Sequence, residues 1–297
     1  MMVDNKKGFH FTINIIMIIL SLCCLLPFIL LVSSSFTDEA VLIRDGYSFF
    51  PKTFSLDAYK YIFSGSAKII KGYGITIFIS IVGTTIGILM TTLLAYPLSR
   101  NNLPGKNKIS FFIFFTMLFN GGLVPSYMVW SNTFHIRDTI WALLLPNLLM
   151  NAFNIILMKN YLKANIPDEI VEAAKIDGAN EFIVLFRVVF PMSKPMIATL
   201  ALMVGLGYWN DWQNGLYYLA GRTDLYSIQN ILNRMLQDAQ FLASGQAGGN
   251  VGEMAASLPS VGIKMAIAVA GILPIMVIYP FMQKYLVKGI TVGAVKG

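Results

Sequence analysis

Side chains that carry chemistry are scarce in this chain of 297 residues. Charged residues make up only 12% of it, about half the share that is usual in soluble domains. It has two cysteines and two histidines, and no HExxH, CxxC, GxSxG, GxxxxGKS or GxxxxGKT motif. These absences exclude the common zinc, dithiol, serine-hydrolase and P-loop nucleotide sites. We therefore expect a protein that is not an enzyme and that itself holds neither a metal nor ATP.

Long apolar segments without charged residues are the main feature of the sequence. Hydrophobic residues make up 56% of the chain and its mean hydropathy is +0.65. A membrane-spanning helix needs about 20 mostly apolar residues. Six segments meet this requirement, at about 11–33, 73–98, 110–130, 139–161, 195–219 and 261–285. The predicted fold class is an all-α integral membrane protein with six transmembrane helices.

Lysine and arginine predict the orientation of these helices. With the N-terminus inside, the inner segments contain thirteen basic residues and the outer segments nine, and the net charge of +7 lies wholly on the inner side. Basic residues gather on the cytosolic side of membrane proteins. We therefore expect both termini in the cytosol. The net positive charge is explained by the orientation in a lipid membrane, and it gives no reason to expect a nucleic-acid partner.

Two predicted spans contain polar residues, and a third contains helix breakers. Gly121, Gly122 and Pro125 either interrupt the third span or mark its outer end. The polar and aromatic residues of the fourth and fifth spans are candidates for a substrate pathway, because buried amides and carboxylates are costly unless they are paired. The same residues could instead tie helices together. They are Asn151, Asn154, Trp209, Asn210, Asp211 and Trp212.

The inner segment 163–194 is the most polar stretch between two predicted spans. Pro167 followed by Asp168 and Glu169 predicts the start of a short helix, and Gly178 predicts its end in a left-handed turn. A second short helix is expected at about 180–189. Its Phe182 and Phe186 are expected to anchor the pair of helices against the ends of the spans.

The first of these helices has the character of a docking surface. Ala173 and Ala174 leave no bulk, so that another surface can come close, and Glu172 beside them can pair with a basic partner. The alternative is an amphipathic helix that rests on lipid. Such helices usually carry basic residues on the polar face, whereas this one carries four acids and one lysine between 168 and 177. The composition favours docking to a protein.

The residues of this segment also match a known pattern. Glu172-Ala-Ala-x-x-Asp177-Gly178-Ala, followed by Phe-Arg and by two prolines four residues apart, resembles the EAA signature of permease subunits of ABC importers. AYPLSR at 95–100, WNDW at 209–212 and the tail at 285–297 resemble other parts of the same family. The chain looks most like the carbohydrate-uptake, maltose-permease-like branch, and within it the polysaccharide and oligosaccharide permeases of Gram-positive bacteria.

This resemblance implies a function, partners and a location. It implies a permease subunit of an ATP-driven sugar importer in the bacterial cytoplasmic membrane, paired with a similar second permease. Two cytosolic ATPase subunits would bind ATP and Mg, and a lipid-anchored extracellular solute-binding protein would deliver the sugar. An importer of the same family for a non-sugar solute, or an ion-coupled carrier, is the alternative.

The resemblance further implies how the chain is divided. Residues 1–69 would form a first span and an outer interfacial segment. Residues 70–297 would form the transport core, with a cytosolic coupling loop at 163–194, between spans four and five, and a C-terminal tail at 287–297. The residues implied in coupling to the ATPase are Glu172, Ala173, Ala174, Asp177, Gly178 and Phe182.

Overall fold

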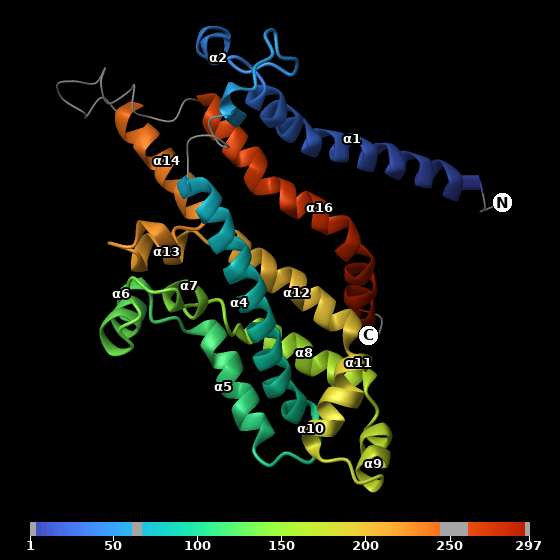
Figure 1. Cartoon of the computed structure of the whole chain (residues 1–297). Coiled ribbons are helices and arrows are strands. Elements are labelled where there is room, and N and C mark those ends of the chain that lie inside the picture. The colour runs from blue at the N-terminus through green and yellow to red at the C-terminus, as the bar shows by residue number, and fades with distance from the viewer. Residues whose placement is uncertain (1–3, 61–66, 244–260, 295–297) are drawn as a thin grey trace. The chain divides into compact units, whose positions relative to one another are not determined.

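The computed structural model describes residues 4–60, 67–243 and 261–294 (Figure 1). In these ranges the regular elements are helices, and the only β-type pairing is an isolated antiparallel bridge between Thr37 and Phe54. The predicted all-α class is thereby confirmed for the described part of the chain. The chain divides into two compact units, residues 1–69 with 232–274 and residues 70–231 with 275–297.

The first unit contains the helices α1 (Asp4–Ser35) and α2 (Glu39–Asp45). It also contains most of α14 (Ile228–Ala243) and the first part of α16 (Val261–Ala294). In α1 the most apolar stretch has no buried side chain, which leaves its surface for lipid or another protein. Glu39 accepts hydrogen bonds of 2.8 Å from the N–H groups of Val261 and Gly262, and so caps the first turn of α16.

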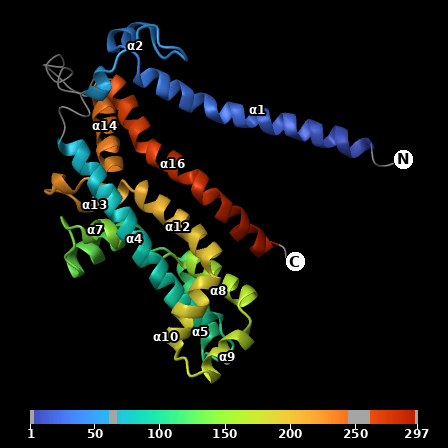
Figure 2. The ribbon, with the colours of Figure 1, turned by 45° about the vertical axis from the view of Figure 1, so that its right-hand side comes forward.

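The second unit is built around α4 (Ala67–Ser99), α5 (Lys106–Leu118), α8 (Ala152–Asn165) and α12 (Lys194–Trp209). Their apolar faces form a core that includes Ala95, Leu98, Met158, Leu162 and Leu200, each at most 2% exposed. Two short helices, α9 (Asp168–Ile176) and α10 (Glu181–Val184), lie together at one end of this unit in both views (Figures 1 and 2). They form the inner segment expected from the sequence.

Three of the described helices are long and apolar enough to cross a membrane, within α1, α4 and α16. Two bent pairs of helices would raise the number to five. The predicted fourth span is not one helix, because the chain forms α7 (Trp141–Leu144) and then an irregular segment before α8 begins. Pro146, and Asn147 with a φ of +62°, lie in that irregular segment. The count of six spans therefore stays a prediction.

The predicted third span is also interrupted. Helix α5 ends at Leu118, and α6 (Leu123–Met128) with η1 (Val129–Thr133) follows at an angle of 114°. Gly122 has a φ of +85°, which only glycine adopts without strain, and it lies directly before α6. The glycines thus separate two helices within the segment that the sequence presents as one apolar run.

The interrupted α7–α8 segment meets a second interruption, between α12 and α13 (Gln213–Tyr218). The hydroxyl of Tyr208 donates to the carbonyl of Leu144 at 2.7 Å, and the amide of Asn214 donates to the carbonyl of Pro146 at 3.1 Å. Broken helices leave carbonyls without an intrahelical partner, and an apolar surrounding requires that such groups be satisfied. The two side chains supply those partners, so residues on either side of the α12–α13 break stabilise the α7–α8 break.

Asp138 joins two segments of the second unit that are more than 80 residues apart in the sequence. Its carboxylate accepts hydrogen bonds from the backbone N–H groups of Ala220, Gly221 and Arg222, at 2.8, 2.8 and 3.2 Å. Its own N–H donates to the carbonyl of Tyr218 at 3.0 Å. The N–H of Gly221, before the other donors, lowers the pKa of the Asp138 carboxyl. The ionised form is therefore the one that holds the two segments together.

Asp138→Asn is expected to lower the thermal unfolding midpoint at pH 7 by about 2 °C. Asparagine tolerates the φ of +58° at this position, so that the loss comes from the charge. A carboxyl with a lowered pKa adds stability above its ordinary value near 3.9 and loses it as the pH falls through the lowered value. The gap between wild type and variant should hence shrink between pH 7 and pH 3 in detergent-solubilised protein. An equal gap at both pH values would contradict the assignment.

Candidate functional site

Helix α9 begins and ends where its local chemistry requires. Asp168 and Glu169 occupy its first turn, where negative charge interacts favourably with the helix dipole. At the other end the N–H of Gly178 donates to the carbonyl of Lys175, and the N–H of Ala179 donates to that of Ala174, both at 3.0 Å. This pattern is a Schellman motif, with Gly178 in the left-handed region at a φ of +86°. The predicted turn is confirmed.

The second helix of the segment starts at a capped turn and continues toward the membrane. Asn180 accepts a hydrogen bond of 2.9 Å from the N–H of Ile183 and so caps α10. Helix α10 runs on through the π-helical turn η2 (Leu185–Val189) and α11 (Phe190–Met192). The chain then bends by 82° into α12. The α9–α10 pair is thus joined to α12 by a short, defined corner.

The pair is anchored by other residues than the sequence suggests. Val171, Val184, Leu185 and Val189 are each at most 4% exposed and belong to the core of the second unit. Phe182 and Phe186, the expected anchors, are 67% and 47% exposed, so that prediction is wrong for this chain. Nearly every residue from 182 to 190 is apolar, and the π-turn changes the angular register, so apolar spacing alone cannot identify the inward face.

Most of the residues predicted to dock an ATPase lie on the exposed part of α9 and the turn after it, although Ala174 packs against the core and Glu172 also lines the cavity beside α4. Glu172, Ala173, Asp177 and Gly178 are exposed and Ala174 is half-buried. Glu172 forms no hydrogen bond or ion pair within the described ranges. A β-carbon added at Gly178 would meet no atom of the described residues within 4 Å, so none of these residues covers the turn. Helix α9 and the turn after it therefore expose acidic and small side chains that the other described residues do not cover.

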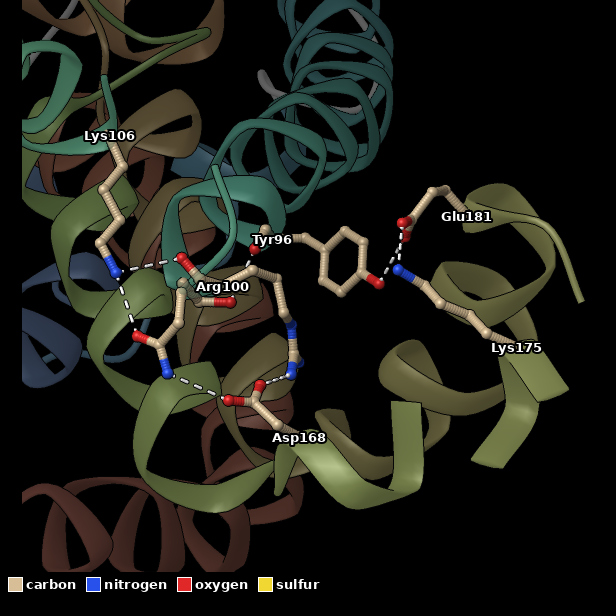
Figure 3. Close-up of polar contacts among 8 residues, drawn as sticks. Tyr96, Arg100, Lys106, Asp168, Lys175 and Glu181 are labelled. Carbon is tan, nitrogen blue, oxygen red and sulfur yellow. Dashed lines mark hydrogen bonds and ion pairs between the residues drawn. The ribbon is translucent and has the colours of Figure 1, made fainter. Parts of the chain in front are cut away.

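The end of α4 contacts both helices of the segment (Figure 3). Arg100 forms an ion pair of 2.8 Å with Asp168 at the start of α9. The Tyr96 hydroxyl donates to the Glu181 carboxylate at the start of α10, at 2.9 Å. Lys175, near the end of α9, forms an ion pair with the same Glu181. We call the two contacts made by Arg100 and Tyr96 the α4 clamp.

Smaller contacts support the α4 clamp. Asn101 donates to the second carboxylate oxygen of Asp168 at 3.1 Å, and Lys106 donates to the Asn101 side-chain oxygen at 3.0 Å. The Arg100 guanidinium lies over the Tyr96 ring, 5.2 Å from its centroid. In the loop, outside the long spans, Lys175 lowers the pKa of the Glu181 carboxyl. Glu181 is thus held in the ionised form that both of its donors need.

A cavity of 450 Å³ lies between the end of α4 and the two loop helices. Leu93, Pro97, Val171, Phe182 and Leu185 contribute apolar surface to it, and the residues of the α4 clamp lie at its polar positions. Among the described residues no group of three His, Cys, Asp or Glu side chains could hold a metal ion.

Sequence reasoning did not single out the α4 clamp. Tyr96 and Arg100 belong to the AYPLSR segment, which the sequence presents only as a family resemblance, and the sequence around Asp168 indicates only the start of a helix. The pairs are separated by 68 and 85 residues. The signal that the sequence offers for such a contact is a charged residue, Arg100, directly at the end of an apolar segment.

The structure also places the predicted substrate-pathway residues. Asn151 caps α8 by accepting from the N–H of Phe153 at 2.9 Å, and one oxygen of Asp211 accepts from the N–H groups of Gln213 and Asn214 at 3.2 Å. Both therefore have structural tasks at the helix breaks. The other oxygen of Asp211 is buried without a hydrogen-bond partner in the described ranges.

The remaining four pathway residues differ in exposure. Asn154 and Trp209 are buried, Trp212 is half-buried and Asn210 is exposed. All of these residues belong to the second unit, around the interrupted α7–α8 and α12–α13 segments. A contact with substrate stays a prediction for each of them.

Several helices that are long and apolar enough to cross a membrane indicate a multi-pass membrane protein. Residues 83–292 match the family model described as binding-protein-dependent transport system inner membrane component, and the chain belongs to this family. The match covers more than half of the chain and includes the inner segment and the α4 clamp. The family resemblance drawn from the sequence is confirmed, and the chain is a membrane permease component.

Two relatives are similar in sequence to this chain along nearly its whole length. Protein LplC of Bacillus subtilis is 40% identical over 92% of this chain and 90% of its own length. The polygalacturonan/rhamnogalacturonan transport system permease protein YtcP of the same organism is 37% identical over 99% of this chain and all of its own length.

A solved structure is also similar. It is the crystal structure of a bacterial ABC transporter involved in the import of the acidic polysaccharide alginate. The likeness has a TM-score of 0.81 at 28% identity and covers 95% of this chain and 97% of that one.

Proposed function

We propose that this chain is one permease subunit of an ATP-driven importer of sugars, with oligosaccharides or fragments of acidic polysaccharides as the substrate class. The observation that carries the proposal is the structural likeness along 95% of the chain to a transporter that imports an acidic polysaccharide. The relative YtcP, named for polygalacturonan and rhamnogalacturonan, supports the same class. The chain would form half of the pathway, beside a homologous second permease.

The inner segment would connect this chain to its source of energy. The described residues offer no nucleotide or metal site of a kind that sequence patterns reveal, which fits ATP and Mg held by two partner ATPases. The exposed surface of α9, with Glu172, Ala173, Ala174, Asp177 and Gly178, would dock in a cleft of an ATPase, and exposed Phe182 would add apolar contact. Glu172, which has no hydrogen bond or ion pair among the described residues, would pair with a basic side chain there.

Movement would then pass from the ATPases to the membrane. Their closure on ATP would displace the α9–α10 pair as a rigid body, because its buried residues belong to the core of α4, α5, α8 and α12. A lipid-anchored binding protein would deliver the sugar from outside. The tail 287–297, of which residues up to 294 continue α16 and the last three lie outside the described residues, would lie on the cytosolic side.

Uptake measurements on a strain that lacks this chain test the proposal. Labelled oligogalacturonides, alginate oligomers, arabino-oligosaccharides and a peptide mixture serve as probes. We expect uptake of at least one saccharide probe to fall to background and to return when the chain is re-expressed, and co-purification to recover an ATPase with it. Loss of peptide uptake alone would favour the importer of a non-sugar solute. Recovery of a functional carrier without any ATPase would favour ion coupling.

A further inference from the structure

The end of α4 meets the coupling loop through two polar contacts, which add to the apolar core that Val171 and Leu185 share with Leu98. Tyr96 lies in the last turn of α4 and Arg100 directly follows the helix, and the Arg100 guanidinium lies over the Tyr96 ring. One reaches the start of α9 and the other the start of α10. The two loop helices are therefore held from the same short stretch of a membrane-spanning helix.

We infer that the α4 clamp is a positioning device, in which Arg100 and Tyr96 fix α9 and α10 relative to α4 and so carry movement of the coupling loop into this span. The inference rests on the proposed function, because it requires that the loop engage an ATPase. It goes beyond that proposal by naming the residues through which α4 takes part. Neither residue needs to touch ATP, sugar or the ATPase.

The Arg100–Asp168 ion pair differs from an ordinary surface pair. The Arg100 side chain is 14% exposed and that of Asp168 is 48% exposed, whereas both partners of Lys60–Asp57 are more than 70% exposed. Shielding from water strengthens such a contact and makes the loss of one partner costly. The Nε and Nη2 atoms of Arg100 are buried and have no acceptor within the described residues. Asp168, bonded to Nη1, is thus the anion that holds the guanidinium in place.

The cavity shows why polar contacts matter at this joint. A space of 450 Å³ separates parts of α4 from α9 and α10, so close packing does not fix the separation of these helices throughout. Val171 and Leu185 pack into the core on one side, and the α4 clamp spans the other. Without it, α9 could shift into the open space while its ATPase-facing surface stayed intact. Force applied to α9 would then be lost before it reached α4.

The experiment uses the complete transporter, with its partner permease, ATPases and binding protein, in lipid nanodiscs. ATP hydrolysis is measured with and without the binding protein loaded with the saccharide identified by uptake. We expect Arg100→Gln and Asp168→Asn each to lower the stimulation ratio by about fivefold, the lower end of typical coupling between sites. Because both remove one contact, the double variant should lose no more than either single variant. Arg100→Lys should restore part of the ratio.

Lys163→Gln is the matched control, since Lys163 is an exposed cation of the same segment without an ion pair in the described ranges. It should leave the ratio unchanged. Tyr96→Phe tests the second contact and should lower the ratio with the complex intact on size exclusion. The α4 clamp is refuted if the single variants keep the wild-type ratio, or if the double variant shows the product of the two losses. Wild-type transporter without any stimulation would instead refute the proposed function.

Discussion

Gly178→Val is expected to abolish stimulation of ATP hydrolysis by the loaded binding protein, with a loss of about tenfold or more. Gly178 ends α9 with a φ of +86°, where a β-branched residue is strongly disfavoured. The two hydrogen bonds of the Schellman motif depend on this conformation, and they set the direction in which the chain turns toward α10. Valine would unwind the turn and separate the docking surface of α9 from the buried residues of α10.

Gly178→Asn tests whether position 178 requires the left-handed backbone conformation or the absence of a side chain. Asparagine tolerates positive φ far better than valine, and no atom of the described part of the chain lies within 4 Å of a β-carbon here. Stimulation in Gly178→Asn should therefore stay within about twofold of wild type. If both variants lose stimulation equally, contact with the ATPase and not the turn is what requires glycine. If Gly178→Val retains stimulation, the loop does not act as the coupling element.

Local features of the loop could be predicted from the sequence because each depends on near neighbours. The start of α9 at Asp168, its end at Gly178 and the start of a second helix at Asn180 all follow from the chemistry of caps and turns. What could not be predicted depends on distant residues. No local rule pairs Arg100 with Asp168, which lies 68 positions later, and no periodicity distinguishes buried Leu185 from exposed Phe186.

The interrupted spans show a second limit of sequence reasoning. Segment 139–161 is uncharged up to Met158 and reads as one span, since hydropathy measures transfer into lipid and not the path of the backbone. Pro146 is the residue of this segment that indicates a break in the helix, but the length of the uncharged run favours a single span. The break is tolerated because Tyr208 and Asn214, on another element, satisfy its carbonyls. Such compensation is a tertiary property.

Gly83→Ala should be the most destabilising small substitution in α4, at about 3 kcal/mol, because it overpacks a buried site. An added β-carbon would lie 2.5 Å from Cε2 and 2.6 Å from Cε1 of the Tyr208 ring, closer than real β-carbons approach other atoms. The ring is fully buried and cannot move away without breaking the 2.7 Å hydrogen bond to the carbonyl of Leu144. The substitution would therefore also leave the broken end of α7 without its partner.

Gly74→Ala supplies the matched control on the same helix. A β-carbon at Gly74 would meet nothing within 4 Å, so alanine there should be neutral or stabilising by up to about 1 kcal/mol through helix propensity. Unfolding midpoints in detergent, and the monodisperse fraction after purification, measure both variants. Tyr208→Leu in the Gly83→Ala background should recover part of the loss, because the smaller side chain relieves the clash although it removes the hydrogen bond. If Gly83→Ala matched Gly74→Ala in stability, the α4–α12 contact would not be held by this close approach, and the link between α4 and the two helix breaks would have to lie elsewhere.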